Sequence, residues 1–85
     1  MRALRAAIAA GDSAELRAAL GERLLILESP AAALQSFEAG LVLDAANAAC
    51  LEGAARTAVV IGDGAKANAY TLALKGIRAG DPRSG

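Results

Sequence analysis

Residues 33–47 read ALQSFEAGLVLDAAN, and they carry the clearest helical pattern of this 85-residue chain. Leu34, Phe37 and Leu41 recur at positions i, i+3 and i+7, so they share one face of a helix. The polar residues fall mostly on the other side: Gln35, Ser36, Glu38 and Asp44. This pattern predicts an amphipathic helix whose apolar face packs against a neighbour.

Two small residues, Ala33 and Gly40, lie beside Phe37 on the same helix. Small side chains let a second helix approach closely, and Phe37 then fills the space between the two helices. Any amphipathic helix of a bundle would share these features. The stretch alone therefore predicts helix packing and leaves the particular fold open.

A period of about 34 residues organises the remainder of the chain, since a unit that starts at Ala14 starts again at Ala48 and reaches Pro82. In the first unit, the positions that fit a repeat of two antiparallel helices are Leu20-Gly21, Ser29-Pro30, Ala33, Phe37 and Gly40. In the second unit they are Leu51, Gly62-Asp63 and Ala67, and Thr71 stands at the position that the aromatic Phe37 occupies in the first unit. Departures from the pattern occur at Ala45, Ala54-Ala55 and Leu74.

These positions resemble the tetratricopeptide repeat family, with one well-matched repeat and one degenerate repeat over residues 14–80. The resemblance implies an all-α fold in which antiparallel helix hairpins stack as a short solenoid of about five helices. It also implies a role in binding other proteins. We expect one domain over residues 1–80, followed by a frayed tail at residues 81–85. Within the domain, the predicted units are an extra N-terminal helix (1–13), repeat one (14–47) and repeat two (48–80).

Helix-breaking and capping residues predict the helix boundaries. Gly11 ends the first helix, and Asp12 or Ser13 caps the second, which runs to about Leu27. Pro30 opens the third helix, since proline is well placed in a first turn. The third helix is expected to end near Asp44. The fourth is expected from about Asn47 to Gly62, and a last helix capped by Asp63 is expected to reach Ile77 or Arg78.

The N-terminal segment has two possible pairings. Gly11-Asp12 could be an interhelical turn, which would make residues 1–10 and 14–27 partners. Alternatively, residues 1–10 are the second helix of a lost upstream repeat. Both arrangements contain five helices.

The composition agrees with a helical chain that has a thin core. Alanine, the best helix former, is the commonest residue, and the chain has one Phe, one Tyr and no Trp. Two repeats are also fewer than the three or so that such stacks need. The last helix presents Ala67, Tyr70, Leu72, Leu74 and Ile77, which is not a well-solvated outer face. We therefore expect a partner, or a second copy, to cover apolar surface.

In this family the first helix of each repeat lines the concave side. Carried over to this chain, that lining includes a candidate partner-binding set: Glu22, Leu25, Ile26, Glu52, Arg56, Val59 and Val60. Members that clamp a peptide carboxylate place Lys and Asn on this lining, and here those places hold Ala18, Glu22, Glu52 and Arg56. We therefore expect an apolar strip in place of a clamp, suited to an amphipathic helix or an extended apolar segment. The alternative is that Leu25, Ile26, Val59 and Val60 are core residues or are covered by the first helix.

Residues that carry chemistry are scarce. The chain has no His and a single Cys, so a histidine base, a disulfide framework and a cysteine-based metal site are all excluded. Cys50 is expected to be a small buried apolar residue. Residues 62–66, GDGAK, lack phosphate-loop and calcium-loop spacing and predict an interhelical turn. We expect neither catalysis nor a cofactor nor a metal.

Charge and hydropathy set the expected surroundings. Nine basic residues balance nine acidic ones, and no segment forms a basic recognition helix, which argues against nucleic acid. Residues 24–27, LLIL, are far too few to span a bilayer, and the N-terminus is a poor signal peptide. A cytoplasmic protein without a membrane partner is expected.

Two function classes lead. The first is a small adaptor or chaperone-like module that holds an apolar segment of a partner protein. The second is a structural or accessory subunit buried in a larger assembly or in a homo-oligomer. An enzyme or a nucleic-acid binder comes a distant third.

Overall fold

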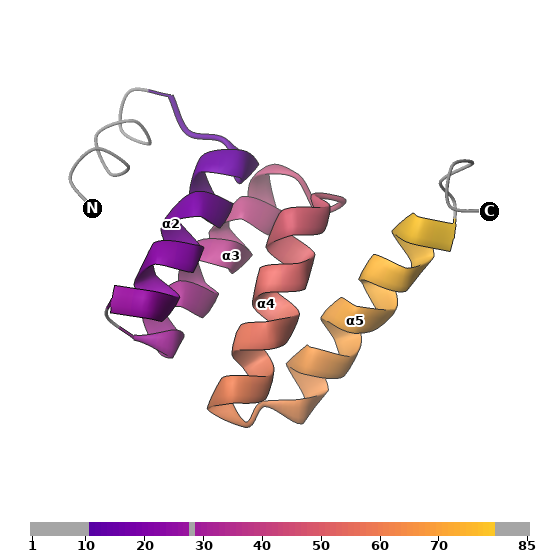
Figure 1. The fold of residues 1–85 in the computed structure, drawn as a ribbon. Helices are drawn as coiled ribbons and strands as arrows, with labels where there is room; N and C mark the ends of the chain where they lie inside the picture. Colours follow the sequence, from indigo (N-terminus) through magenta and orange to yellow (C-terminus); the bar gives the residue numbers. More distant parts are fainter. Residues whose placement is uncertain (1–10, 28, 80–85) are drawn as a thin grey trace.

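The computed structural model describes residues 11–27 and 29–79, which form four α-helices (Figure 1). These are α2 (Ala14–Leu27), α3 (Pro30–Leu43), α4 (Ala48–Ile61) and α5 (Gly64–Ala79). The predicted all-α class is confirmed. The predicted fifth helix at the N-terminus and the predicted tail at 81–85 lie outside the described residues.

Each helix begins with a side chain that accepts a hydrogen bond from a backbone N–H three residues ahead, which satisfies a donor that the helix itself leaves unpaired. The expected helix starts at Pro30 and near Asn47 and the expected cap at Asp63 are confirmed, and of the two candidates Asp12 and Ser13 it is Ser13 that caps α2. The four pairs are Ser13 with Leu16 (3.2 Å), Ser29 with Ala32 (3.5 Å), Asn47 with Cys50 (3.0 Å) and Asp63 with Lys66 (3.0 Å).

Gly62 ends α4 as predicted. Its φ of 90° lies in the left-handed region that a residue without a Cβ adopts at little cost. Its N–H donates to the Ala58 carbonyl at 3.0 Å, and the Asp63 N–H donates to the same carbonyl at 2.9 Å. The GDGAK segment is therefore an interhelical turn followed by the first turn of α5, as expected.

The helices form two hairpins, α2 with α3 and α4 with α5, and α4 also packs against both α2 and α3. The starts of α2 and α4, at residues 14 and 48, are as far apart in the sequence as those of α3 and α5, at residues 30 and 64. Two contacts join the starts of α2 and α4. The Cys50 thiol donates to the Ala14 carbonyl at 3.3 Å, and the Asn47 amide donates to Glu15 at 3.4 Å. From this shared end α2 and α4 extend the same way and pack against each other (Figure 1), so the two helices run in the same direction.

Phe37 on α3 is fully buried between two glycines, Gly21 on α2 and Gly53 on α4. A Cβ built on Gly21 would lie 2.7–2.9 Å from three ring atoms, and one on Gly53 would lie closer still. The sequence pattern paired Phe37 with Ala33 and Gly40 on its own helix. Gly40 instead lies against Arg17 and Ala14 of α2 and against Cys50 of α4. Three helices thus meet at one ring because glycines lie on two of them.

The expectation for the last helix is only partly met. Leu74 is buried at 7% exposure, and Tyr70, Ala67 and Ile77 are half-buried. Leu72 alone of the five is largely exposed. The remainder of the predicted apolar face is covered because α5 turns it toward the other helices.

Candidate protein-binding groove

The seven predicted groove residues lie on α2 and α4, which run side by side in the same direction. Ile26 is 79% exposed, Val59 is 68% exposed and Val60 is 62% exposed. Leu25 is half-buried and packs against the core. The alternative that all four aliphatic residues are core is therefore wrong for Ile26, Val59 and Val60. The other alternative, cover by the predicted N-terminal helix, concerns residues 1–10, which lie outside the described residues.

Four of the seven residues line one hollow of about 300 Å³: Glu22, Leu25, Ile26 and Arg56. The hollow draws three side chains from α2 and one from α4. Glu22 and Arg56 occupy the same position in their respective helices, each being the ninth residue. Equivalent positions of the two hairpins therefore meet there. Glu52, Val59 and Val60 lie on α4 outside the lining of this hollow.

The charged groove residues differ in how they are held. Glu52 accepts from Arg78 of α5 at 3.3 Å, an exposed ion pair of little energetic weight. Glu22 and Arg56 are exposed, and neither forms an ion pair within residues 11–27 and 29–79. The hollow therefore offers one acidic and one basic group, Glu22 and Arg56, beside the aliphatic side chains of Leu25 and Ile26.

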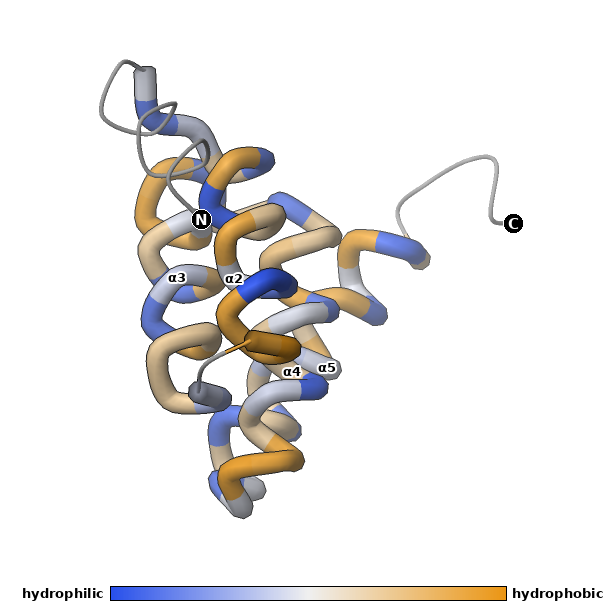
Figure 2. Tube along the Cα trace, turned by 60° about the vertical axis from the view of Figure 1, so that its left-hand side comes forward, coloured by the Kyte–Doolittle hydropathy of each residue, from blue (hydrophilic) through white to orange (hydrophobic). Residues whose placement is uncertain are grey.

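Sequence reasoning missed two further aliphatic residues at the same helix ends. Leu27 is the last residue of α2, Ile61 is the last residue of α4, and both are exposed. Hydrophobic residues gather toward the C-terminal ends of these helices (Figure 2). The consecutive apolar residues LLIL (24–27) and VVI (59–61) could have indicated this exposure, because consecutive helix residues point in different directions and cannot all lie on one buried face.

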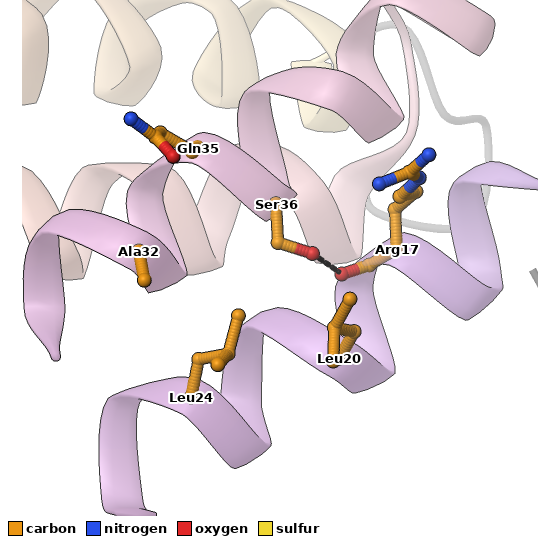
Figure 3. Close-up of a pocket in the computed structure, with 6 residues that line it drawn as sticks. All are labelled: Arg17, Leu20, Leu24, Ala32, Gln35 and Ser36. Atoms are coloured by element: carbon orange, nitrogen blue, oxygen red, sulfur yellow. Dashed lines mark hydrogen bonds between the residues drawn. The ribbon is translucent and has the colours of Figure 1, made fainter. Parts of the chain in front are cut away.

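A second, smaller hollow of about 210 Å³ lies between α2 and α3 (Figure 3). Its lining is Arg17, Leu20, Leu24, Ala32, Gln35 and Ser36. Ser36 was expected on the polar side, but it is buried, and its hydroxyl is satisfied there by donating to the Arg17 carbonyl at 2.7 Å. Leu20 and Leu24 belong to the core, so this hollow is a surface depression over packed side chains.

A polar cluster joins α5 to α3. The Glu38 carboxylate accepts from Lys66 at 2.9 Å and from the Tyr70 hydroxyl. Burial opposes ionisation of Glu38, but the hydrogen bonds from Tyr70 and Lys66 outweigh it and lower its pKa below the usual value. Burial, followed by the bond to Glu38, raises the pKa of Tyr70 to about 12. No sequence pattern indicated this cluster, because its members lie on two different hairpins.

Cys50 is fully buried in the core, as expected. Burial, reinforced by the negative charges of Glu15 and Asp44, raises the pKa of its thiol. The thiol is therefore held in its unreactive protonated form, and its place in the fold is that of a small packing residue.

Comparison with protein-family models, curated proteins and solved structures finds no match to this chain. Within the part of the chain that the structure describes, no helix combines the length and apolar character needed to cross a membrane. The groove is therefore interpreted from its own geometry.

Proposed function

We propose that this chain is a small protein-interaction module, an adaptor or chaperone-like unit of tetratricopeptide type, that binds an apolar segment of a partner protein. The proposed site is the groove between α2 and α4. We place the module in the cytoplasm, without a catalytic, cofactor-dependent or nucleic-acid-binding role.

The repeat interpretation is supported by the spacing and direction of the helices. Both members of the second hairpin follow their counterparts in the first at the same sequence offset, since α2 and α4 start at residues 14 and 48 and α3 and α5 at residues 30 and 64. The first helices of the two hairpins run parallel and contact each other. In a solenoid this arrangement gathers equivalent positions into one continuous binding surface.

The observation that carries the binding role is the exposure of three aliphatic side chains: Ile26, which lines the hollow, and Val59 and Val60, which follow the hollow-lining Arg56 on α4. Complete burial of an aliphatic side chain contributes about 1.5–3 kcal/mol. Three such side chains provide an appreciable driving force, although ordering the bound segment offsets part of it. A single exposed aliphatic residue would need no explanation, but a group at the ends of adjacent helices indicates an interaction surface.

A peptide-display selection on the immobilised chain, followed by calorimetric titration of the selected peptide, tests this proposal. We expect saturable binding to the wild-type chain that Val60→Asp abolishes, because the new carboxylate would have to be desolvated in the interface. Gln35→Asp, which changes an exposed position on α3, is the matched control and should bind normally. Equal binding by both folded variants would refute the groove.

A structural subunit is the second candidate, and a different surface favours it. Val42 at the end of α3 is 87% exposed, and Leu43 and Leu72 are also exposed. None of these three lies in the groove, so more than one face has apolar surface to cover. A permanent neighbour would cover several faces at once.

The native mass of the chain expressed alone separates the two candidates. Light scattering on a size-exclusion column should give a monomer for an adaptor whose groove is open. A discrete dimer or larger species would show that copies cover one another, and would favour the structural subunit.

A further inference from the structure

Among the four described helices, α5 is the least anchored. Among its sixteen residues, Leu74 is the one buried residue. Of the other described helices, α4 packs directly against it, and α3 reaches it through the side chain of Glu38. Figure 1 shows α5 diverging from α4 toward its C-terminal end. α2, α3 and α4, by contrast, all contact one another.

The buried apolar residues divide in the same way. The main core cluster draws its buried members from α2, α3 and α4, and α5 adds only the half-buried Tyr70 at its edge. Leu51, Ala58 and Leu74 are buried but lie outside that cluster. Leu51 and Ala58 are two turns apart on α4, so they share one helix face. Leu51, Ala58 and Leu74 are three of the twelve buried hydrophobic residues in the described part of the chain, so their burial provides only a small part of the apolar stabilisation of the fold.

Polar contacts from α3 and α4 add to the attachment of α5. The carboxylate of Glu38 on α3 accepts hydrogen bonds from both Lys66 and Tyr70, and its side chain is 30% exposed. The carboxylate of Glu52 on α4 pairs with Arg78, at 3.3 Å, as its one α5 partner, and its side chain is 52% exposed. Glu38 is the less exposed carboxylate and has two donors, so its interaction with α5 is the stronger of the two. A single exposed ion pair, such as that of Glu52, contributes little.

We propose that α5 opens as a unit while α2, α3 and α4 stay folded, and that Glu38 is the latch that sets how often it opens. Opening separates Lys66 and Tyr70 from Glu38 and uncovers the α4 face that holds Leu51 and Ala58. It also releases Glu52, one of the groove residues, from Arg78. α5 thus covers the α4 face that carries Leu51 and Ala58 and can detach from it. This proposal holds whether or not the groove binds a partner.

The chain contains its own two reporters for this motion, because it has one Tyr and one Cys. Tyr70 lies in the latch and reports the attachment of α5. Cys50 lies fully buried in the main core and reports the opening of α2, α3 and α4. The experiment is a urea titration of the full chain, followed by Tyr70 fluorescence and by pulsed thiol labelling of Cys50.

We expect the Tyr70 transition at lower urea than the Cys50 transition. Glu38→Gln should raise the opening constant of α5 roughly tenfold, because it removes a charged acceptor of two hydrogen bonds. The Cys50 midpoint should not change, since α5 has already detached when the core opens. Glu52→Gln is the matched control, and its effect on the Tyr70 transition should be much smaller.

Two results would overturn the proposal. Coincident Tyr70 and Cys50 transitions in the wild-type chain would show that the four helices open together. Equal shifts of both midpoints in Glu38→Gln would show that Glu38 stabilises the whole fold and is not a latch for α5.

Discussion

At the scale of single residues, the packing around Phe37 shows how a chain poor in large side chains holds three helices together. The ring occupies the space that side chains at Gly21 and Gly53 would otherwise fill. The glycines weaken their helices locally, because each loses more conformational freedom on folding than an alanine would. Contact between the ring and two backbones offsets that loss.

Gly53→Ala should destabilise the fold by roughly 1–3 kcal/mol, because the added methyl group overlaps the Phe37 ring. Gly76→Ala is the matched change on α5, where a Cβ has nothing within 4 Å. That variant should gain about 0.5–1 kcal/mol from better helix propensity. Urea unfolding measures both effects, with Cys50 labelling as the reporter for Gly53→Ala and Tyr70 fluorescence as the reporter for Gly76→Ala on α5. A stabilised Gly53→Ala would contradict the packing described for Phe37.

Ser36→Ala should cost about 1 kcal/mol, since the hydroxyl is buried and donates to the Arg17 carbonyl at 2.7 Å. Thr71→Ala removes an exposed hydroxyl that bonds only within its own helix, to the Ala67 carbonyl at 2.7 Å. That control should be neutral or slightly stabilising. Thermal unfolding compares the two, and equal changes would show that the contact between α2 and α3 contributes nothing.

At the scale of helices, the latch makes the attachment of α5 depend on pH. The pKa of Glu38 is lower in the folded state than its ordinary value of 4.5. A carboxyl group of this kind stabilises above its unfolded pKa, and the stabilisation is lost as the pH falls through the folded pKa. The groups that face Glu38 are Lys66 and Tyr70 on α5 and Asp63 before it, and the first two stay protonated in this range.

Tyr70 sets the opposite limit. Its pKa is raised from 10.0 to about 12, so its contribution is present below the unfolded pKa and is lost as the pH rises toward the folded one. The Tyr70 signal should therefore report an attached α5 between about pH 5 and pH 9 and a detaching α5 on both sides. In Glu38→Gln the acid-dependent loss should disappear from this signal. A wild-type signal unchanged down to about pH 3 would rule out the carboxylate latch.

The helix boundaries were predictable because they depend on local chemistry. Pro30, Asn47 and Gly62 act on neighbouring backbone groups, so their effect can be read from a few adjacent residues. Contacts between helices were less accessible. The pattern identified Phe37 as a packing residue but not Gly21 and Gly53 as its neighbours, and it placed Ser36 on the wrong side. The bonds of Glu38 depend on how two hairpins stack, which helical periodicity does not encode.

The candidate groove was predictable in outline for a related reason. Residues 25 and 26 occupy the same positions in α2 as residues 59 and 60 occupy in α4, so a shared surface followed from the side-by-side packing of these two helices. Their degree of burial did not follow, because it depends on where the packed interface between α2 and α4 ends. Leu25 lies within its reach, while Ile26 projects beyond it.

At the scale of the whole molecule, the small number of large buried side chains predicts a marginally stable domain. The described core contains one aromatic side chain that is fully buried, and alanine supplies much of the remainder. We expect an unfolding free energy near the lower end of the usual range, about 5 kcal/mol. Urea denaturation at 25 °C measures it, with pulsed labelling of Cys50 as the reporter. A value above about 10 kcal/mol would show that the interior is better packed than its composition indicates.

The packing of Phe37 against glycine has a consequence for mutational tolerance. In most domains the bulky interior side chains are the positions at which substitutions are least accepted. Here Gly21, Gly40 and Gly53 each lie where a single methyl group would meet another residue at short range. A saturation-mutagenesis library selected for correct folding should therefore retain fewer alternatives at these three glycines than at Ile26 or Val42. In this protein the least replaceable side chains would be the ones that consist of a hydrogen atom.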